Sequence, residues 1–236
     1  MSIARAPYER TDDTTAVRAT PAEAATAAVV PLIAVRAHGP ARRTMDVAFA
    51  GLALVLLLPL LVAIAVLVAT TSRGPVLYRQ QRIGTGGRPF VIVKFRTMRI
   101  GADDVADEVF AQQDDGSGPL NKIHDDPRVT APGRWLRRLS LDELPQLWNV
   151  LSGSMALVGP RPTTPREVAR FAPLDYQRLA VRPGITGITQ VSGRSDLDWS
   201  DAIRMDLNYV ENRTLRLDLL ILLRTVPAVV LARGAY

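Results

Sequence analysis

Two adjacent carboxylates, Asp142 and Glu143, have the clearest potential for chemistry in this sequence of 236 residues. They precede a stretch in which leucines recur at helical spacing. Neighbouring residues on a helix point about 100° apart, so the two acids cannot act as a symmetrical pair, but they can take two roles at one site. A helix N-terminus favours an ionised Asp142, which suits a nucleophile or a Mg²⁺ ligand.

Arginines on both sides of this pair supply the charge that phosphoryl transfer needs. Arg137 precedes the two acids, and Arg161 stands between two prolines in a stiff loop. Guanidinium groups bind phosphate oxygens through paired hydrogen bonds and stabilise developing negative charge. The alternative is structural, because Ser140 and Glu143 have the spacing of a helix capping box. Pro145 argues against that box, since it would lie just past the first turn.

A competing metal site involves Asp196 and Asp198. Two acids that flank one residue can hold a divalent ion on a nucleotide sugar, as in a metal-dependent glycosyltransferase. The same acids precede an apolar-periodic segment, where aspartate is a natural helix cap. The pattern therefore leaves a catalytic and a structural interpretation open.

The elements that must position these residues form a mixed pattern. Residues 76–83 and 89–98 are predicted as two strands around a glycine-rich turn. Three segments have the apolar spacing of helices, and they are residues 133–151, 196–212 and 215–231. The last of these carries three charges and fits either an interfacial helix or a core helix. The pattern predicts an α+β fold class, a small, mostly helical domain with a short β-hairpin.

Composition narrows the classes of function. The chain has no cysteine and only two histidines, which excludes a thiol nucleophile and a cysteine-based zinc or iron–sulfur site. Its formal net charge of +6 favours polyanionic partners. We find no zinc motif, recognition helix or aromatic-interleaved basic sheet, so the sequence argues against a nucleic-acid partner. The basic stretch 73–99 contains no acid and fits lipid headgroups or phosphates.

Residues 47–71 contain no charge and are mostly apolar, which is a membrane signal. Pro59 stands in the middle of this segment and removes one helical hydrogen bond. Each arm around it has about twelve residues, or roughly 18 Å of helix, which is short of the roughly 30 Å hydrocarbon core. Because basic residues flank both ends, a re-entrant hairpin is one prediction. A kinked spanning helix and a buried soluble helix are the alternatives.

Six motifs together resemble the bacterial sugar transferase family, the monotopic polyprenyl-phosphate phosphoglycosyl transferases. In chain order they are Gly74-Pro75-Val76 with Tyr78-Arg79-Gln80, Lys94–Met98, Asp126–Thr130, Ser140–Leu147, Leu157–Pro162 and Arg182–Gly187. The resemblance covers residues 43–232 and points to the short form, which lacks the multi-span membrane module of larger members. It leaves residues 1–42 outside, and their composition predicts a disordered tail.

The resemblance implies a reaction. Such enzymes transfer a sugar phosphate from a nucleotide diphosphosugar, usually a UDP-sugar, to polyprenyl phosphate and release UMP, and they require Mg²⁺. This is the initiating step of membrane-linked glycan or exopolysaccharide synthesis. Asp142 would be the nucleophile, would form a phosphosugar–aspartate intermediate and would ligate the metal, and Glu143 would support it. A non-catalytic membrane scaffold in polysaccharide assembly is the non-enzymatic alternative.

The resemblance also implies binding residues and an organisation. The expected substrate-binding residues are Lys94, Arg137, Arg161, Arg182, Gln190 and Arg194. Pro59 would break a re-entrant membrane helix at residues 43–73, and residues 74–236 would form the catalytic domain with an interfacial C-terminal helix. The expected location is the cytoplasmic face of the plasma (inner) membrane. The oligomeric state stays open, and a homodimer is compatible with the sequence.

Three positions depart from the family pattern. Leu58 and Ala156 stand where serine is common, and Thr189 stands where an aromatic residue is usual. None of them touches the Asp-Glu pair. The change at Thr189 is expected to alter contacts to the sugar or the lipid.

Overall fold

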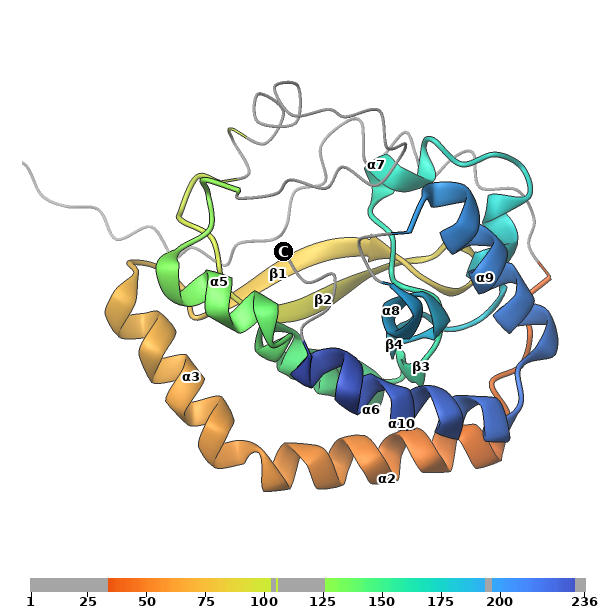
Figure 1. The fold of residues 1–236 in the computed structure, drawn as a ribbon, viewed down its shortest axis with the longest axis horizontal. Helices are drawn as coiled ribbons and strands as arrows, with labels where there is room; N and C mark the ends of the chain where they lie inside the picture. The colour runs from red at the N-terminus through yellow and green to blue at the C-terminus, as the bar shows by residue number, and fades with distance from the viewer. Residues whose placement is uncertain (1–33, 103–104, 106–125, 194–196, 232–236) are drawn as a thin grey trace, which may run out of the picture.

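The computed structural model describes residues 34–102, 105, 126–193 and 197–231, and in this part helices surround two small sheets (Figure 1). One sheet is the antiparallel pair β1–β2, and the other is the parallel pair β3–β4. The predicted α+β class is confirmed. Arg194, Asp196 and most of the first 42 residues lie outside the described residues.

The predicted hairpin is present as β1 (Leu77–Ile83) and β2 (Pro89–Phe95). The register pairs Tyr78 with Lys94 and Ile83 with Pro89. The turn between them, η1 (Thr85–Gly87), uses glycines at positive φ, which L-residues with a side chain rarely adopt. The second strand ends three residues earlier than predicted, since the chain leaves the hairpin after Phe95 and forms a single bridge between Met98 and Val129.

Residues 133–151, which have the apolar spacing of a helix, do not form one continuous helix. The segment forms α5 (Ala131–Arg138), the 3-10 helix η2 (Leu141–Gln146) and α6 (Leu147–Ser152). Ser140 adopts the left-handed conformation at φ 53°, which ends one helix before the next begins. Its side chain makes no cap hydrogen bond, so the capping box of Ser140 and Glu143 is absent, in agreement with the argument from Pro145. Pro145 lies within the short 3-10 helix.

The remaining helices and strands follow α6 and complete the domain. They are β3 (Ala156–Val158), α7 (Pro165–Val168), η3 (Asp175–Ala180), β4 (Gly184–Thr186), α8 (Ile188–Ser192), α9 (Trp199–Asn212) and α10 (Leu215–Val230). The two long C-terminal helices agree with the predicted segments. Asp198 stands at the N-cap of α9, but its side chain makes no cap hydrogen bond.

The uncharged segment forms two helices, α2 (Pro40–Leu56) and α3 (Leu58–Thr71), which meet at a bend of 63° (Figure 1). Pro59 is the second residue of α3 and has no N–H to donate to the preceding turn. Among the described residues, no single helix has the length and apolar character to cross a membrane, whereas the bent pair meets both criteria when taken together.

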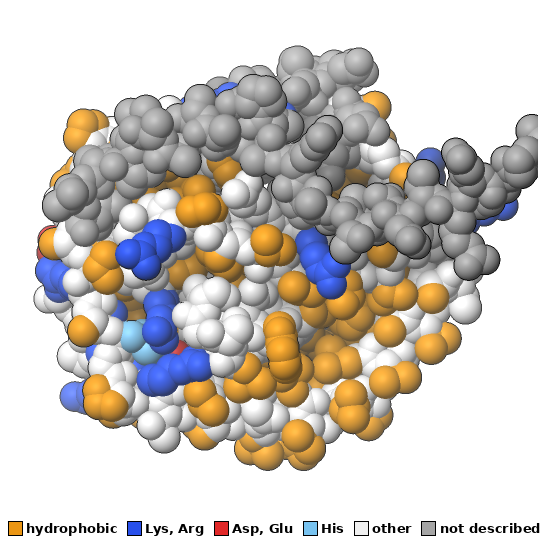
Figure 2. Space-filling view, turned by 180° about the vertical axis from the view of Figure 1, so that it is seen from behind, with side chains coloured by type: hydrophobic (Ala, Val, Ile, Leu, Met, Phe, Trp, Pro, Cys, Tyr) orange, Lys and Arg blue, Asp and Glu red, His pale blue; other side chains and the backbone are white. Residues whose placement is uncertain are grey.

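Much of the apolar surface of these helices is exposed (Figure 2). Leu52, Val55 and Leu56 at the end of α2 are each more than half exposed, and so are Leu58 and Val62 in α3. Helix α10 buries Asp218 and Ile221 but also exposes a row of large apolar side chains, Leu215, Leu219, Leu220, Leu223 and Val226. An exposed apolar surface of this extent is typical of a protein or membrane contact.

The apolar core lies between the hairpin, α6 and the long helices. The largest cluster joins Ala50 of α2, Ile92 of β2, Val150 of α6 and Ile221 of α10. A second cluster packs Ile64 and Val68 of α3 against Phe95 and Leu136. Both arms of the bent pair are therefore packed against the domain that carries Asp142.

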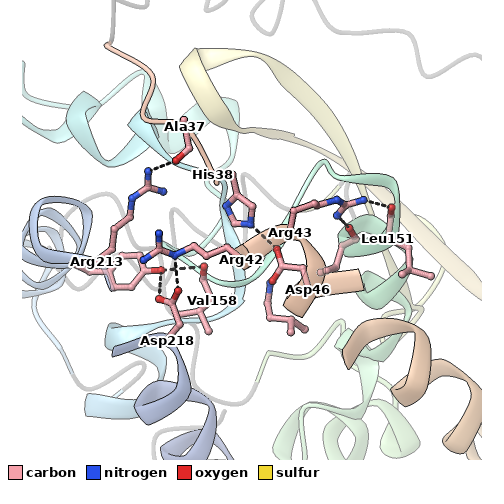
Figure 3. Close-up of polar contacts among 12 residues, drawn as sticks. Ala37, His38, Arg42, Arg43, Asp46, Leu151, Val158, Arg213 and Asp218 are labelled. Atoms are coloured by element: carbon pink, nitrogen blue, oxygen red, sulfur yellow. Dashed lines mark hydrogen bonds and ion pairs between the residues drawn. The ribbon is translucent and has the colours of Figure 1, made fainter. Parts of the chain in front are cut away.

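Polar contacts at the start of α2 hold this helix to three other segments (Figure 3). Arg42 Nε donates to Asp218 of α10 at 2.7 Å. Arg43 donates to the carbonyl oxygens of Val150 and Leu151 in α6, each at 2.6 Å. Asp46, which is 1% exposed, accepts from Leu157 N and lies 2.7 Å from His38 Nε2. We call this set, Arg42, Arg43 and Asp46 with their partners, the α2 latch.

Candidate active site

Asp142 and Glu143 lie in the first turn of η2, against strand β2. The side chain of Asp142 is buried, whereas that of Glu143 is 29% exposed. Lys94 of β2 donates from Nζ to Glu143 Oε1 at 2.8 Å. The two carboxylates are thus unequal, because one is paired with a lysine and the other is enclosed by the fold.

This inequality appears in their pKa values. Burial raises the pKa of Asp142 above its usual range, and the neighbouring Glu143 raises it further. The positive charges of Lys94 and Arg137 lower this pKa but do not outweigh the two raising effects. Burial alone would raise the pKa of Glu143 too, but Lys94 and Arg161 lower it to about 2. The pKa of Asp142 is raised even though the residue lies in the first turn of a helix, because desolvation by burial is the largest influence on it.

Arg137 approaches Asp142 from the last turn of α5. Its Nε donates to the hydroxyl of Thr97 at 2.9 Å. Burial lowers the pKa of Arg137, while the charges of Asp142 and Asp126 raise it. Asp126 itself is paired with Arg128 at 2.7 Å, so it neutralises a second arginine of the same region.

Arg161 is exposed in the loop between β3 and α7, and its charge acts on both Glu143 and Arg137. Backbone hydrogen bonds fix the two residues that precede Arg161. Gly184 N donates to Pro160 O at 2.9 Å, and Gly159 N donates to Thr186 O at 2.9 Å. Arg161 therefore presents its charge from a stiff backbone, as its flanking prolines predict.

Arg82 of β1 is a buried cation beneath the same loop, and the sequence analysis did not select it. Its Nη1 donates to Pro162 O at 3.1 Å, and its Nη2 donates to Gln80 Oε1 at 2.6 Å. Its closest carboxylate contact is Glu167 at 3.7 Å. Its charge also acts on Glu143, so it belongs to the electrostatic surroundings of the carboxylate pair.

With this geometry in place, the comparisons with known proteins identify the family. The family model described as bacterial sugar transferase matches residues 37–232. The chain belongs to this family. The match begins before α2 and extends past α10, so it includes the bent pair of helices as well as the carboxylate site.

Curated relatives agree with the assignment. The exopolysaccharide production protein ExoY of Rhizobium meliloti is 43% identical over 201 residues, which cover 84% of this chain and 89% of the relative. An undecaprenyl-phosphate galactose phosphotransferase of Salmonella typhimurium is 41% identical over 83% of this chain and 41% of its own length. A UDP-glucose:undecaprenyl-phosphate glucose-1-phosphate transferase of Caulobacter vibrioides is 39% identical over 83% of this chain and 72% of its own length.

The structure brings five of the six charged catalytic and binding positions that it describes to one place. Asp142, Glu143, Lys94 and Arg137 share electrostatic or hydrogen-bond contacts, and Arg161 adds its charge. Arg182 is placed elsewhere. Burial is the largest influence on the pKa of Arg182 and lowers it. The charged groups that also act on this pKa are Arg43 and Asp46 of the α2 latch.

Gln190 lies in α8, where its Oε1 accepts from the Thr189 hydroxyl at 2.9 Å. Helix α8 packs mainly against α9 and α10. Arg194 and Asp196 are outside the described residues. Asp198 is exposed at the start of α9, and in the described part of the chain no group of three or more acidic, histidine or cysteine side chains has metal-binding geometry.

The sequence contains a signal that would have found Arg82. Alternation along a strand places Tyr78, Gln80 and Arg82 on one face. The hairpin register pairs Tyr78 with Lys94, so the face that carries Lys94 also carries Arg82. Thr97, whose hydroxyl accepts a hydrogen bond from Arg137, has no comparable signal in the sequence. Its contact with Arg137 depends on how the chain returns from β2 to α5.

Proposed function

We propose that this sugar transferase moves a sugar phosphate from a nucleotide diphosphosugar, a UDP-sugar, onto polyprenyl phosphate and releases UMP. The single observation that carries the proposal is the buried Asp142 beside the Glu143–Lys94 ion pair, with Arg137, Arg161 and Arg82 around them. The names of the relatives support the acceptor, since two of them act on undecaprenyl phosphate. The ExoY relative supports a role in exopolysaccharide production.

Charge explains why a covalent step is favourable. Both substrates are anionic, so direct attack of one phosphate on the other meets repulsion. In the proposed reaction an Asp142 oxygen bonds to the sugar-bearing phosphorus, and the bond from that phosphorus to the UMP oxygen breaks. An oxygen of the polyprenyl phosphate then bonds to the same phosphorus and releases Asp142. The cations at the site stabilise the negative charge that builds up in both steps.

Mg²⁺ is the proposed cofactor. Magnesium is bound through one or two carboxylates together with substrate phosphates rather than by an all-protein cage. The described site offers that donor set, because Asp142 makes no salt bridge and stands beside Glu143. Asp142 would hold the ion, and a bound magnesium would neutralise charge on the diphosphate of the donor.

The proposed setting is the cytoplasmic face of the plasma membrane. The exposed apolar surfaces of α2, α3 and α10 support a membrane contact, and the bend at Pro59 supports a re-entrant path. At 1.5 Å per residue, the arms of 17 and 14 residues are about 25 Å and 21 Å long, each short of a roughly 30 Å hydrocarbon core. In this proposal residues 74–236 form the catalytic domain at the surface.

Nucleotide release tests the reaction. Purified protein in lipid receives Mg²⁺, polyprenyl phosphate and a panel of UDP-sugars, beside the variants Asp142→Asn and Asp198→Asn. We expect UMP from one UDP-sugar, a loss of about a thousandfold or more in Asp142→Asn because the nucleophile is removed, and no loss in Asp198→Asn. Release of UDP with loss at Asp198 would instead support the metal-dependent glycosyltransferase. Undiminished UMP in Asp142→Asn would exclude the aspartate mechanism.

A further inference from the structure

Thr97 is a buried residue two positions after the end of β2, and both its backbone and its side chain contact helix α5 or its N-cap. Its carbonyl oxygen accepts from Thr130 N at 2.9 Å and from the Thr130 hydroxyl at 3.2 Å. Thr130 is the N-cap of α5 and accepts in turn from Gly133 N at 3.1 Å. The carbonyl of Thr97 thus fixes the start of the helix.

The hydroxyl of Thr97 reaches the other end of the same helix. It accepts from Arg137 Nε at 2.9 Å, and Arg137 lies in the last turn of α5 (Ala131–Arg138). The helix is packed closely against Thr97, since a Cβ on Gly133 would collide with the Thr97 carbonyl. One residue therefore sets both the position of α5 and the direction of its arginine.

Arg137 needs such an anchor because its surroundings contain competing charges. Asp142 and Asp126 attract its guanidinium, whereas Arg128 and Arg161 repel it. Arg128 is held by Asp126 through contacts of 2.7 to 3.2 Å, so Asp126 is already occupied. Without a fixed Nε, the guanidinium would be free to turn among these groups.

The anchor is neutral, and this matters for the chemistry. A carboxylate in place of the hydroxyl would neutralise Arg137 and reduce its effect on Asp142. A hydroxyl accepts one hydrogen bond and leaves the positive charge intact, so the charge stays directed at Asp142 and at any phosphate bound there. The arrangement combines fixed geometry with full charge.

We propose that Thr97 is a positioning residue of the transferase, whose hydroxyl holds Arg137 in the orientation that serves Asp142 and the transferred phosphate. This inference rests on the proposed function. It assigns a role to the side chain of a residue that acts through Arg137 and does not itself contact substrate.

The test is a double-mutant cycle on UMP release, with Thr97→Val, Arg137→Lys and the combined variant. We expect Thr97→Val to lower kcat by about tenfold or more, as for loss of a hydrogen bond to a charged group. The KM for the UDP-sugar should change less than kcat if the hydrogen bond matters most in the transition state. In the Arg137→Lys background, Thr97→Val should lower kcat by less than about twofold, because the Nε–H that bonds to the threonine hydroxyl is already absent.

Two further variants separate positioning from folding. Thr97→Ser keeps the hydroxyl and should retain most of the activity of the unaltered protein. Thr163→Val is the matched control, since Thr163 is also buried and its hydroxyl has no partner among the described residues. Thermal unfolding of each variant in lipid shows whether a loss of kcat comes from destabilisation.

The outcomes are distinct. Equal losses from Thr97→Val in both backgrounds, or equal losses from Thr97→Val and Thr163→Val, would overturn the positioning role while UMP release by the unaltered protein still stands. Absence of UMP release from the unaltered protein would overturn the proposed function itself, and the positioning role with it.

Discussion

At the scale of single residues, the main feature of the site is that two adjacent acids have opposite environments. Glu143 is held ionised by Lys94 and Arg161, with a pKa of about 2. Asp142 is buried next to that negative charge, and its pKa is raised. A carboxylate with a raised pKa is more basic and less well solvated, and both properties favour nucleophilic attack once it is ionised.

Removing Lys94 should change the pH dependence of the reaction. Lys94 lowers the pKa of both acids, so in Lys94→Met both values rise. Because only ionised Asp142 can attack, activity falls as the pH falls through its folded-state pKa. We expect the acid limb of kcat/KM to move upward by about one to three pH units.

The control for this prediction is Arg79→Met, which removes an exposed cation from the neighbouring strand. It should leave the acid limb in place. A Lys94→Met variant with reduced kcat/KM at every pH but an unchanged acid limb would contradict the assignment of that limb to Asp142.

The residues of the site could be predicted from sequence only where a local motif carries them. Adjacent acids and a proline-flanked arginine are visible in the chain, and the structure brings Asp142, Glu143 and the Arg161 charge together. Arg82 needed the strand register, and Thr97 needed the return of the chain to α5. Those relations depend on tertiary packing.

At the scale of elements, the bend between α2 and α3 decides the path of the apolar segment. A straight helix from Pro40 to Thr71 would be about 48 Å long, more than enough for a hydrocarbon core of roughly 30 Å. The bend of 63° shortens the reach of the pair along either arm. Proline supplies this bend because it removes a hydrogen bond and its ring displaces the preceding turn.

Replacement of Pro59 should therefore alter membrane topology. The chain has no cysteine, so single cysteines introduced as Thr44→Cys and Arg73→Cys can be labelled without background. We expect both to react with an impermeant maleimide from the same face of sealed vesicles. In Pro59→Leu the pair can straighten, and a fraction of Arg73→Cys should become accessible only from the opposite face.

Pro227→Leu is the matched control, because Pro227 also lies within an apolar helix, α10. It should leave the labelling unchanged. Labelling of the two cysteines from opposite faces in a chain with Pro59 intact would exclude the re-entrant path.

Some helices and strands can be predicted from the sequence better than others. The hairpin and the two C-terminal helices follow strong periodic patterns, and the structure confirms them. Residues 133–151 also have helical spacing, but they form three pieces because Ser140 adopts a left-handed conformation and Pro145 interrupts the hydrogen-bond pattern. Periodicity reports which side chains face the core, and it does not report where the backbone turns.

At the scale of the whole molecule, the α2 latch joins segments that are far apart in the sequence (Figure 3). The side chain of Asp218 is 2% exposed. Its carboxylate accepts a hydrogen bond from Arg42 at 2.7 Å and another from the Tyr209 hydroxyl at 2.8 Å. Loss of one partner of a buried pair leaves an uncompensated charge, which costs more than the pair contributes.

Arg42→Met should therefore destabilise the folded domain by about 3 kcal/mol, since Asp218 would stay buried without its cation. The combined variant Arg42→Met/Asp218→Asn should recover part of this loss, because the buried charge is removed as well. Chemical unfolding in detergent, followed by tryptophan fluorescence, gives both values. Arg216→Met, at an exposed arginine of α10, the helix that carries Asp218, is the control and should change the stability little. Equal stability of Arg42→Met and the unaltered protein would show that the pair is dispensable.

Arg43 of the latch is hydrogen-bonded to the carbonyl oxygens of Val150 and Leu151, a few residues beyond the turn that carries Asp142. These hydrogen bonds connect the proposed membrane helix to the helix that directly follows the turn with Asp142. In the proposed re-entrant path both ends of the bent pair lie at one face of the bilayer, so the distance of Asp142 from the membrane depends on that face alone. The enzyme would then work equally well in thick and thin bilayers, since the distance to the opposite leaflet does not enter its geometry.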